Sequence, residues 1–302
     1  MAVVLIAAGG TIASRPRPDG AVAVALSGAD LVARAGLDPA AVELVDMARG
    51  PSWSLAADDM AAIARAAVER SGRAPVVVTH GTDTLEETAF LAWLLGGTRP
   101  VAFTGAMRHD AHPEPDGPAN LRAAVALAEA GVDGPVVHLA GESHHARWAT
   151  KTDTTAVTSF RSVGGSGVPA PPPPAGGRLV TAVAEVRSHV GVDAGVVDWH
   201  LDRGARGVVV QGTGTGNVHG GLVPGIERAL AAGVPVVVAS RCATGAVAPV
   251  YGGPGGLHEL AALGCIPAGD LPAHKARLAL WVALGADDRP EAVRAWFAAL
   301  LG

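Results

Sequence analysis

An α/β fold with a doubly wound parallel sheet is the fold class that this sequence predicts, and two observations lead to it. Short valine-rich runs alternate along the chain with segments whose apolar residues recur at helical spacing. The valine-rich runs are almost continuously apolar, as is typical of parallel strands that helices cover on both faces. Regular alternation of strands and helices favours an open sheet with helices on both sides.

The predicted strands are short, apolar and rich in β-branched residues. The first run follows Met1 with no positively charged region and stops at Gly9, so it predicts a strand and not a signal peptide. The predicted strands are Val3–Ala8, Val76–Thr79, Pro100–Thr104, Val136–Ala140, Gly207–Gln211 and Val234–Ser240.

The predicted helices lie between these strands. The first should be capped by Asp58 or Asp59, and its apolar stripe runs from Met60 to Val68 at spacings of three and four residues. The other predicted helices are Glu86–Leu95, Ala119–Ala130, Val223–Ala232, Lys275–Leu284 and Glu291–Leu301.

Composition limits the class of protein. The 302 residues are 49% hydrophobic, which is enough for a full core and two domains. The net charge is −5 and no run of Lys or Arg could neutralise phosphates, so we expect no nucleic-acid and no membrane partner. Cys242 and Cys265 are too few for a disulfide framework and lack metal-ligand spacing. We expect a soluble, cytoplasmic protein.

A segment rich in glycine and proline interrupts the pattern between residues 164 and 177. Its four consecutive prolines exclude a helix or a central strand and favour extended polyproline II structure. We interpret residues 166–177 as a linker between domains at 1–165 and 178–302. A long surface loop within one domain is the alternative.

Two threonine-bearing loops follow two of the predicted strands. Thr11 lies in a glycine-rich turn after Val3–Ala8, and Thr82 with Asp83 follows Val76–Thr79. Ligands bind at the carboxyl ends of strands in open α/β sheets, so we expect both hydroxyls to face one cavity. A threonine such as Thr11 is, taken singly, more often a turn or cap residue. The turn also lacks the lysine and the glycine spacing of phosphate-binding loops.

Asp83 stands just before a predicted helix, where an aspartate often caps the N-terminus. Thr84 offers the same function, with Glu87 three residues later at capping-box spacing. We therefore expect Thr84 to cap the helix and to leave Thr82 and Asp83 for chemistry. His80, at the strand end, is either a base or a structural histidine.

Lys151 is an isolated lysine in a lysine-poor chain. Near a threonine hydroxyl a lysine would favour the alkoxide form, although most lysines are solvated surface charges. The loop Gly212–Asn217 is only weakly similar to a dinucleotide-binding turn, because Asn217 replaces the third glycine. Four histidines lack a carboxylate or cysteine at a recognised ligand spacing, so we expect no metal site. They are His109, His112, His144 and His145.

Ordered segments along nearly the whole chain make the sequence resemble the bacterial-type L-asparaginase family, which includes the glutaminase-asparaginases. The first two segments match the family's signatures, and chance does not explain both in this order together with the others. The segments are Gly9–Ala13, His80–Ala89, Thr104–Arg108, Asp116–Leu121, Gly214–Asn217 and Gly269–Leu271 followed by Lys275–Arg277.

The resemblance implies roles for the matching residues. Thr11 would be the nucleophile that attacks the side-chain amide carbon. Thr82, Asp83 and Lys151 would form a second catalytic cluster. The substrate-binding residues would be Ser52 at the α-carboxylate with Trp53 beside it, Thr82, Asp83 at the α-amino group, Ala106 through its carbonyl, and Asn217 from a neighbouring subunit.

The resemblance also implies the architecture and the assembly. A larger N-terminal asparaginase catalytic domain, 1–165, would join a smaller flavodoxin-like C-terminal asparaginase domain, 178–302. The assembly would be a homotetramer of intimate dimers, or a homodimer, with active sites between subunits. Neither a cofactor nor a metal would be needed.

The chain departs from the family pattern around the nucleophile. The family's loop tyrosine is missing from Arg15–Ser27, where Val22–Val24 take its approximate place, and the acidic residue that often pairs with it has no clear counterpart in Val250–Gly253. Trp53 replaces a frequent glutamine. We hypothesise that Tyr251, the only tyrosine, supplies the missing hydroxyl.

The sequence therefore predicts an amidohydrolase of asparagine catabolism. It would convert L-asparagine to L-aspartate and ammonia through a threonine nucleophile and an acyl-enzyme intermediate. Three alternatives stay open. One is a related amidase that prefers glutamine or a D-amino-acid amide. The second is an asparagine-binding protein with impaired catalysis, and the third, an oxidoreductase, rests on Gly212–Gly216 alone.

Overall fold

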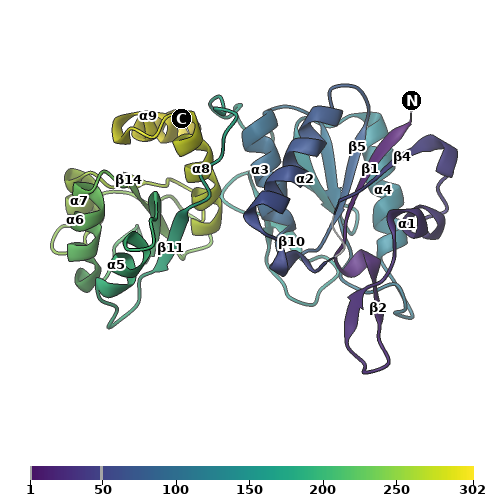
Figure 1. Cartoon of the computed structure of the whole chain (residues 1–302), viewed down its shortest axis with the longest axis horizontal. Coiled ribbons are helices and arrows are strands. Elements are labelled where there is room, and N and C mark those ends of the chain that lie inside the picture. Colours follow the sequence, from purple (N-terminus) through teal and green to yellow (C-terminus); the bar gives the residue numbers. More distant parts are fainter. Residues whose placement is uncertain (1, 48–49) are drawn as a thin grey trace. The chain divides into compact units, whose positions relative to one another are not determined.

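The computed structural model describes residues 2–47 and 50–302. Met1, which we assigned to the N-terminal domain, lies outside them. The chain separates into two compact units, Met1–Pro171 and Pro172–Gly302 (Figure 1). The division falls inside residues 166–177, and this segment stays our proposed linker.

The first unit is built on a sheet whose described strands follow the order β4-β1-β5-β6-β7-β8. All neighbours are parallel except β8, which pairs antiparallel with β7. The strands are β1 Val3–Ala8, β4 Val42–Asp46, β5 Val76–His80, β6 Val101–Thr104, β7 Pro135–Leu139 and β8 Glu142–His145.

Helices cover both faces of this sheet (Figure 1). Leu5 and Val77 of the sheet pack with Leu31 of α1 and Leu121 of α4 in one buried cluster. On the other face α2 packs against β1, β5 and the neighbouring α3. The helices are α1 Gly28–Arg34, α2 Ala57–Arg70, α3 Leu85–Gly96 and α4 Gly117–Ala130.

The chain reverses its direction of winding between β1 and β5. It passes from β1 outward to β4, then returns to β5 on the other side of β1 and continues to β6 and β7. The last residue of β1, Ala8, lies opposite the last residue of β5, His80. The loops after these strands therefore begin side by side, at the kind of switch point where open α/β sheets bind ligands.

The second unit is smaller and has a parallel sheet in the order β11-β12-β13-β14. Val197 of α5, Ile226 of α6 and Leu260 of α7 pack on the face that carries Val208. Leu280 of α8 lies beside Gly207, which faces the other way. The elements are β11 Val183–Arg187, α5 Gly195–Leu201, β12 Gly207–Gly212, α6 Val223–Ala231, β13 Val236–Ser240, α7 Leu257–Leu263, β14 Ile266–Pro267, α8 Ala273–Ala286 and α9 Pro290–Leu301.

The predicted fold class is confirmed, with a larger doubly wound N-terminal part and a smaller α/β C-terminal part. The expected cap of α2 is wrong. Its N-cap is Ala56, which makes no side-chain bond, and Asp58 and Asp59 lie in the first turn, where carboxylates favour the helix dipole. Helix α4 begins at Gly117, before the predicted Ala119, because Pro118 suits the first turn of a helix.

Short elements between the main ones were not predicted. The paired strands β2 Ser14–Pro16 and β3 Val22–Val24 form one hairpin, and β9 Ala149–Lys151 with β10 Phe160–Ser162 forms another. The remaining short elements are the 3₁₀ turns η1 Thr11–Ala13, η2 Pro39–Ala41, η3 Ser52–Ser54 and η4 Gly220–Leu222.

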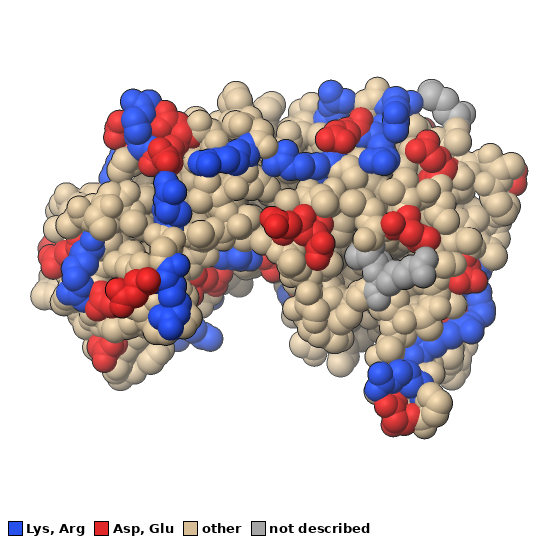
Figure 2. Space-filling model, viewed as in Figure 1, with Lys and Arg blue, Asp and Glu red and all other residues tan. Residues whose placement is uncertain are grey.

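The surface carries charges of both signs. On the face shown in Figure 2, basic and acidic side chains are interspersed over a largely uncharged surface. Within residues 2–47 and 50–302, no helix is both long and apolar enough to span a membrane.

Candidate functional site

The loops after β1 and β5 touch each other through their backbones. Gly10 has a φ of +84°, and a Cβ there would overlap the backbone of Gly81. A Cβ on Gly81 would lie 2.5 Å from Ser52 Oγ. Glycine is thus required at both positions, and three segments far apart in the sequence meet at one point.

A cavity of about 470 Å³ opens where these segments meet, within the usual size range of small-molecule sites. Predicted site residues line it from all three segments. The remaining lining comes from the β2–β3 hairpin and from the loop after β6. The lining residues are Gly10, Thr11, Ser14, Val22–Val24, Pro51, Ser52, Trp53, Gly81, Thr82, Asp83, Met107 and His109.

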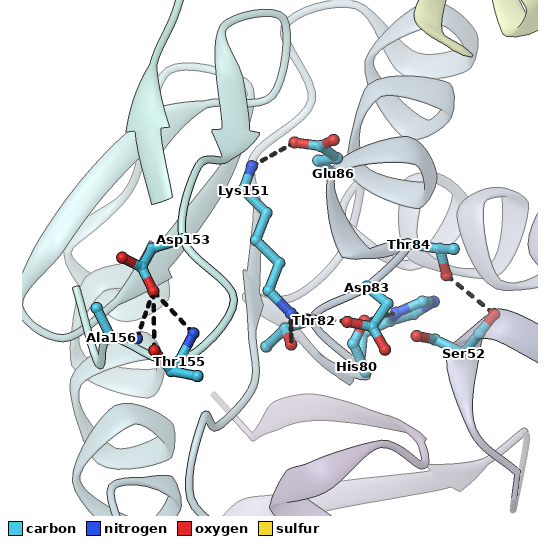
Figure 3. Close-up of polar contacts among 11 residues, drawn as sticks. Ser52, His80, Thr82, Asp83, Thr84, Glu86, Lys151, Asp153, Thr155 and Ala156 are labelled. Carbon is cyan, nitrogen blue, oxygen red and sulfur yellow. Dashed lines mark hydrogen bonds and ion pairs between the residues drawn. The ribbon is translucent and has the colours of Figure 1, made fainter. Parts of the chain in front are cut away.

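Lys151 joins Thr82 and Asp83 into one polar cluster (Figure 3). Its Nζ, at the end of β9, donates to Thr82 Oγ1 at 2.9 Å and to Asp83 Oδ1 at 2.7 Å. Thr82 is buried, whereas the Asp83 side chain is half exposed. An ammonium group held against a hydroxyl and a carboxylate stabilises negative charge on either, so the cluster can assist proton transfer at Thr82.

The expected capping box at Thr84 is absent. Thr84 is the N-cap of α3, but its side chain makes no cap bond. Its Oγ1 instead donates to the carbonyl of Ser52 at 3.1 Å (Figure 3). The hydroxyl is drawn away from the helix because η3 packs against this loop. Asp83 does not cap the helix either, since its carboxylate faces Lys151.

His80 connects the loop after β5 to helix α3. Its ring is fully buried, with Nδ1 2.9 Å from the carbonyl of Gly81 and Nε2 3.0 Å from Thr88 Oγ1. Burial lowers the pKa of His80 to about 4, so the ring is neutral near pH 7. A neutral imidazole that donates from Nδ1 must accept at Nε2, which matches these two partners. The geometry favours the structural histidine over the base.

Ser52 is a cavity residue whose hydroxyl is buried. Its side chain is almost fully buried, and within the described part of the chain Oγ has no hydrogen-bond partner. A buried side-chain hydroxyl without a partner is uncommon in proteins. Trp53, the next residue, lines the same cavity with its side chain largely exposed.

Thr11 is the first residue of η1 and is half-buried at the cavity wall. The turn below it is fixed because Ala13 N and Ser14 Oγ both donate to the carbonyl of Gly10, at 3.0 and 2.8 Å. The hairpin that follows is fastened by Arg15, whose Nε and Nη2 donate to Asp110 Oδ2 at 2.8 and 2.7 Å. These hydrogen bonds hold the turn that carries Thr11 and the hairpin that follows it.

Three further residues of the site hypotheses are not in the lining of this cavity. Ala106 is buried in the core of the first unit, directly before the cavity residue Met107. Asn217 belongs to the second unit, where its Oδ1 accepts from Leu257 N at 3.2 Å. Tyr251 also belongs to the second unit and is mostly exposed.

The histidines do not form a metal-binding group in the described part of the chain. Among the residues that the structure describes, no three His, Cys, Asp or Glu side chains are grouped so as to hold a metal ion. His109 lines the cavity and meets the ring of His112 edge-on at 6.0 Å. His144 faces Glu142, with Nε2 3.5 Å from Oε2.

Sequence reasoning missed His109 and Met107 as cavity residues. A usable signal existed, since Met107 belongs to the matched segment Thr104–Arg108, which begins at the end of β6, and His109 follows that segment. It also missed Glu86, whose carboxylate accepts from the backbone N–H of Lys151. The two residues are 65 positions apart, and no pattern in the sequence connects them.

Comparisons with known proteins agree along nearly the whole chain. The family model described as "Asparaginase, N-terminal" matches residues 2–168, and that described as "Glutaminase/Asparaginase C-terminal domain" matches residues 182–297. A probable L-asparaginase of Deinococcus radiodurans is 38% identical over 97% of this chain and 96% of its own.

Two further matches are a relative with a different name and a solved structure. A glutamyl-tRNA(Gln) amidotransferase component of Methanothermobacter thermautotrophicus is 30% identical over 74% of this chain and 57% of its own. The crystal structure of a probable cytoplasmic L-asparaginase from Campylobacter jejuni superimposes with a TM-score of 0.82 at 27% identity, covering 99% of both chains.

Proposed function

The chain belongs to the asparaginase family, and on that premise we propose that it hydrolyses the side-chain amide of L-asparagine to give L-aspartate and ammonia. The observation that carries the proposal is the shared cavity, which is lined by Thr11 on one loop and by the Lys151-bound Thr82 and Asp83 on the other. Relatives named L-asparaginase support this substrate.

The first half of the proposed reaction transfers the acyl group to Thr11. Its Oγ bonds to the amide carbon and loses its proton, the C–N bond breaks, and the nitrogen leaves as ammonia once it has gained that proton. Backbone N–H groups of the loops at 9–14 and 80–84 would stabilise the oxyanion, each well-placed donor by about 3 kcal/mol. The product of this half is an aspartyl ester of Thr11.

The second half returns the free enzyme. Water adds to the ester carbon, the ester C–O bond breaks, and the Thr11 oxygen recovers a proton as aspartate leaves. We assign to Thr82 the orientation of this water, because its hydroxyl is held in place by Lys151 Nζ, and the water's proton passes to the Thr11 oxygen as the ester bond breaks. Asp83 balances the charge of the Lys151 ammonium at 2.7 Å.

Substrate binding is proposed from the polar groups in and next to the cavity. The Ser52 hydroxyl would take the α-carboxylate, beside Trp53, and the half-exposed Asp83 carboxylate would take the α-amino group. The Ala106 carbonyl would receive the amide nitrogen. By resemblance, Asn217 would reach the site from a neighbouring subunit of a homotetramer or homodimer, and like the Campylobacter protein the chain would be cytoplasmic.

The activation of Thr11 is the least usual part of the proposal. The wall above it is Val22–Val24, which offers no side-chain hydroxyl. Our hypothesis that Tyr251 supplies one predicts that Tyr251→Phe lowers turnover of asparagine. Full turnover in that variant would rule the hypothesis out.

The amidotransferase relatives favour a second candidate, an amidase with a preference for glutamine. One methylene of difference in a substrate changes its binding free energy by only about 1–3 kcal/mol. A preference for glutamine over asparagine therefore needs only a small change in the cavity. Competing asparagine and glutamine in one assay gives the ratio of kcat/KM directly.

Ammonia release by the purified protein tests the proposal. Asparagine, glutamine and D-asparagine should be compared as substrates, with Thr11→Ala and Thr82→Ala as variants. We expect each variant to lower kcat by about 10³-fold or more, since loss of one member of a catalytic set removes most of its effect. Tight binding of asparagine without any ammonia from the wild type would instead identify a binding protein.

A further inference from the structure

We infer that Glu86 is a positioning residue, whose carboxylate holds the backbone of Lys151 so that its ammonium group reaches Thr82 and Asp83. The inference deepens the proposed function and rests on it. Glu86 Oε2 accepts a hydrogen bond from Lys151 N at 2.6 Å (Figure 3).

The strand that carries Lys151 is too short to fix this residue alone. β9 has three residues, and its antiparallel partner β10 bonds to the next residue, where Thr152 N donates to the carbonyl of Ser159 at 2.8 Å. Successive N–H groups of a strand point to opposite sides, so the Lys151 N–H points away from β10. Glu86 takes the donor that the hairpin leaves unused.

Glu86 is well placed because it belongs to α3, the helix that follows the loop carrying Thr82 and Asp83. Thr82 and Asp83 lead directly into α3, and Glu86 is the second residue of that helix. The carboxylate is nearly buried, and a short bond from an N–H group to a charged oxygen is stronger than one to a neutral acceptor. The helix therefore fixes the hydroxyl and, through Glu86, the backbone from which the ammonium extends.

The positioning matters because a lysine side chain is long and flexible. Four rotatable bonds separate the Lys151 backbone from Nζ, and the ammonium must meet Thr82 Oγ1 and Asp83 Oδ1 together. On the far side, Asp153 Oδ1 accepts from Thr155 N and Ala156 N at 2.8 and 2.7 Å and so fixes the turn that follows. Glu86 is the group that acts on the N–H of Lys151 itself.

Three variants test the inference by kcat and KM for asparagine. Glu86→Asp withdraws the carboxylate by one methylene, and we expect kcat to fall about 10- to 100-fold, because a displacement of about 1 Å has effects of that size. Glu86→Gln keeps an acceptor oxygen at the same reach and should lose less. KM should change less than kcat in both. Glu87→Gln, at the next helix position, is the matched control and should keep wild-type kcat.

A double-mutant cycle separates positioning from general support of the fold. If Glu86 acts through Lys151, Glu86→Asp should lower kcat in the wild type but scarcely at all in Lys151→Met. A loss of equal factor in both backgrounds would overturn the inference while leaving the proposed function standing. Glu86→Ala with the same cycle serves if Glu86→Asp does not fold. No ammonia from the wild type would overturn both proposals.

Discussion

Among single residues, His80 is a buried side chain that supports the candidate site without lining the cavity. His80 carries no exposed atom, yet it joins the carbonyl of Gly81 to Thr88 on α3. The sequence allowed two roles for this histidine, and only the burial and the two partners distinguish them. Thr11, Thr82 and Asp83 could be proposed from strand-end position alone, whereas Glu86 could not, because its partner is set by tertiary packing.

The protonation of His80 predicts a dependence of stability on pH. Its folded pKa, about 4, lies below the unfolded value of 6.5, so between these pH values the unfolded state binds more protons. Stability from this group is therefore complete above pH 6.5 and falls as the pH drops toward 4. At pH 5 the loss should be about 2 kcal/mol.

Urea unfolding of the wild type and of His80→Gln at pH 7 and pH 5 measures this contribution. The decrease in unfolding free energy from pH 7 to pH 5 should be smaller in His80→Gln by about the amount stated. Equal decreases in the two proteins would show that His80 is not held neutral by burial.

Among the strands, length and burial decide which ones a sequence pattern can reveal. β1, β5 and β12 were predicted within a residue of their observed ends, because buried parallel strands read as continuous apolar runs. β2, β3, β9 and β10 have three residues each, too few to show any period. The edge strand β11, Val183–Arg187, alternates with charged residues and was missed for that reason.

The contact between the two loops predicts that Gly10 tolerates no side chain. Gly10→Ala would strain a residue at φ +84° and force its Cβ into the backbone of Gly81. We expect a loss of unfolding free energy of about 2–4 kcal/mol, with a matching fall in ammonia release. Thermal unfolding and the activity assay check both effects.

Gly20→Ala is the matched control for this prediction. Gly20 has a similar φ of +82° in the turn of the β2–β3 hairpin, but a Cβ there would have no atom within 4 Å. Its cost should be limited to the backbone strain, about 1 kcal/mol. If the two variants were equally stable and equally active, the close approach of the loops would be wrong.

For the whole molecule, family resemblance implies more than the residue pattern does. Composition and a proline-rich segment predict two domains, and the described chain has two compact units. No periodicity or spacing predicts an oligomer, because an interface between subunits leaves no local signature. The proposed sharing of sites between subunits, with Asn217 from the neighbour, rests on the family alone.

Complementation between inactive variants tests that sharing. Thr11→Ala and Asn217→Ala chains should each have low activity, but when co-expressed they should form some sites with both residues intact. We expect the mixture to release ammonia faster than the sum of the two parents, and light scattering should show a dimer or tetramer. A mixture no more active than that sum, or a monomer, would contradict shared sites.

The most direct measurement of the central claim is a crystal structure with L-aspartate, the proposed product, bound. We predict that its side-chain carboxyl carbon lies between the hydroxyls of Thr11 and Thr82, with the α-carboxylate on Ser52 Oγ. Aspartate bound outside this cavity, or a carboxyl group that meets neither threonine, would contradict the claim that the two loops act on one amide.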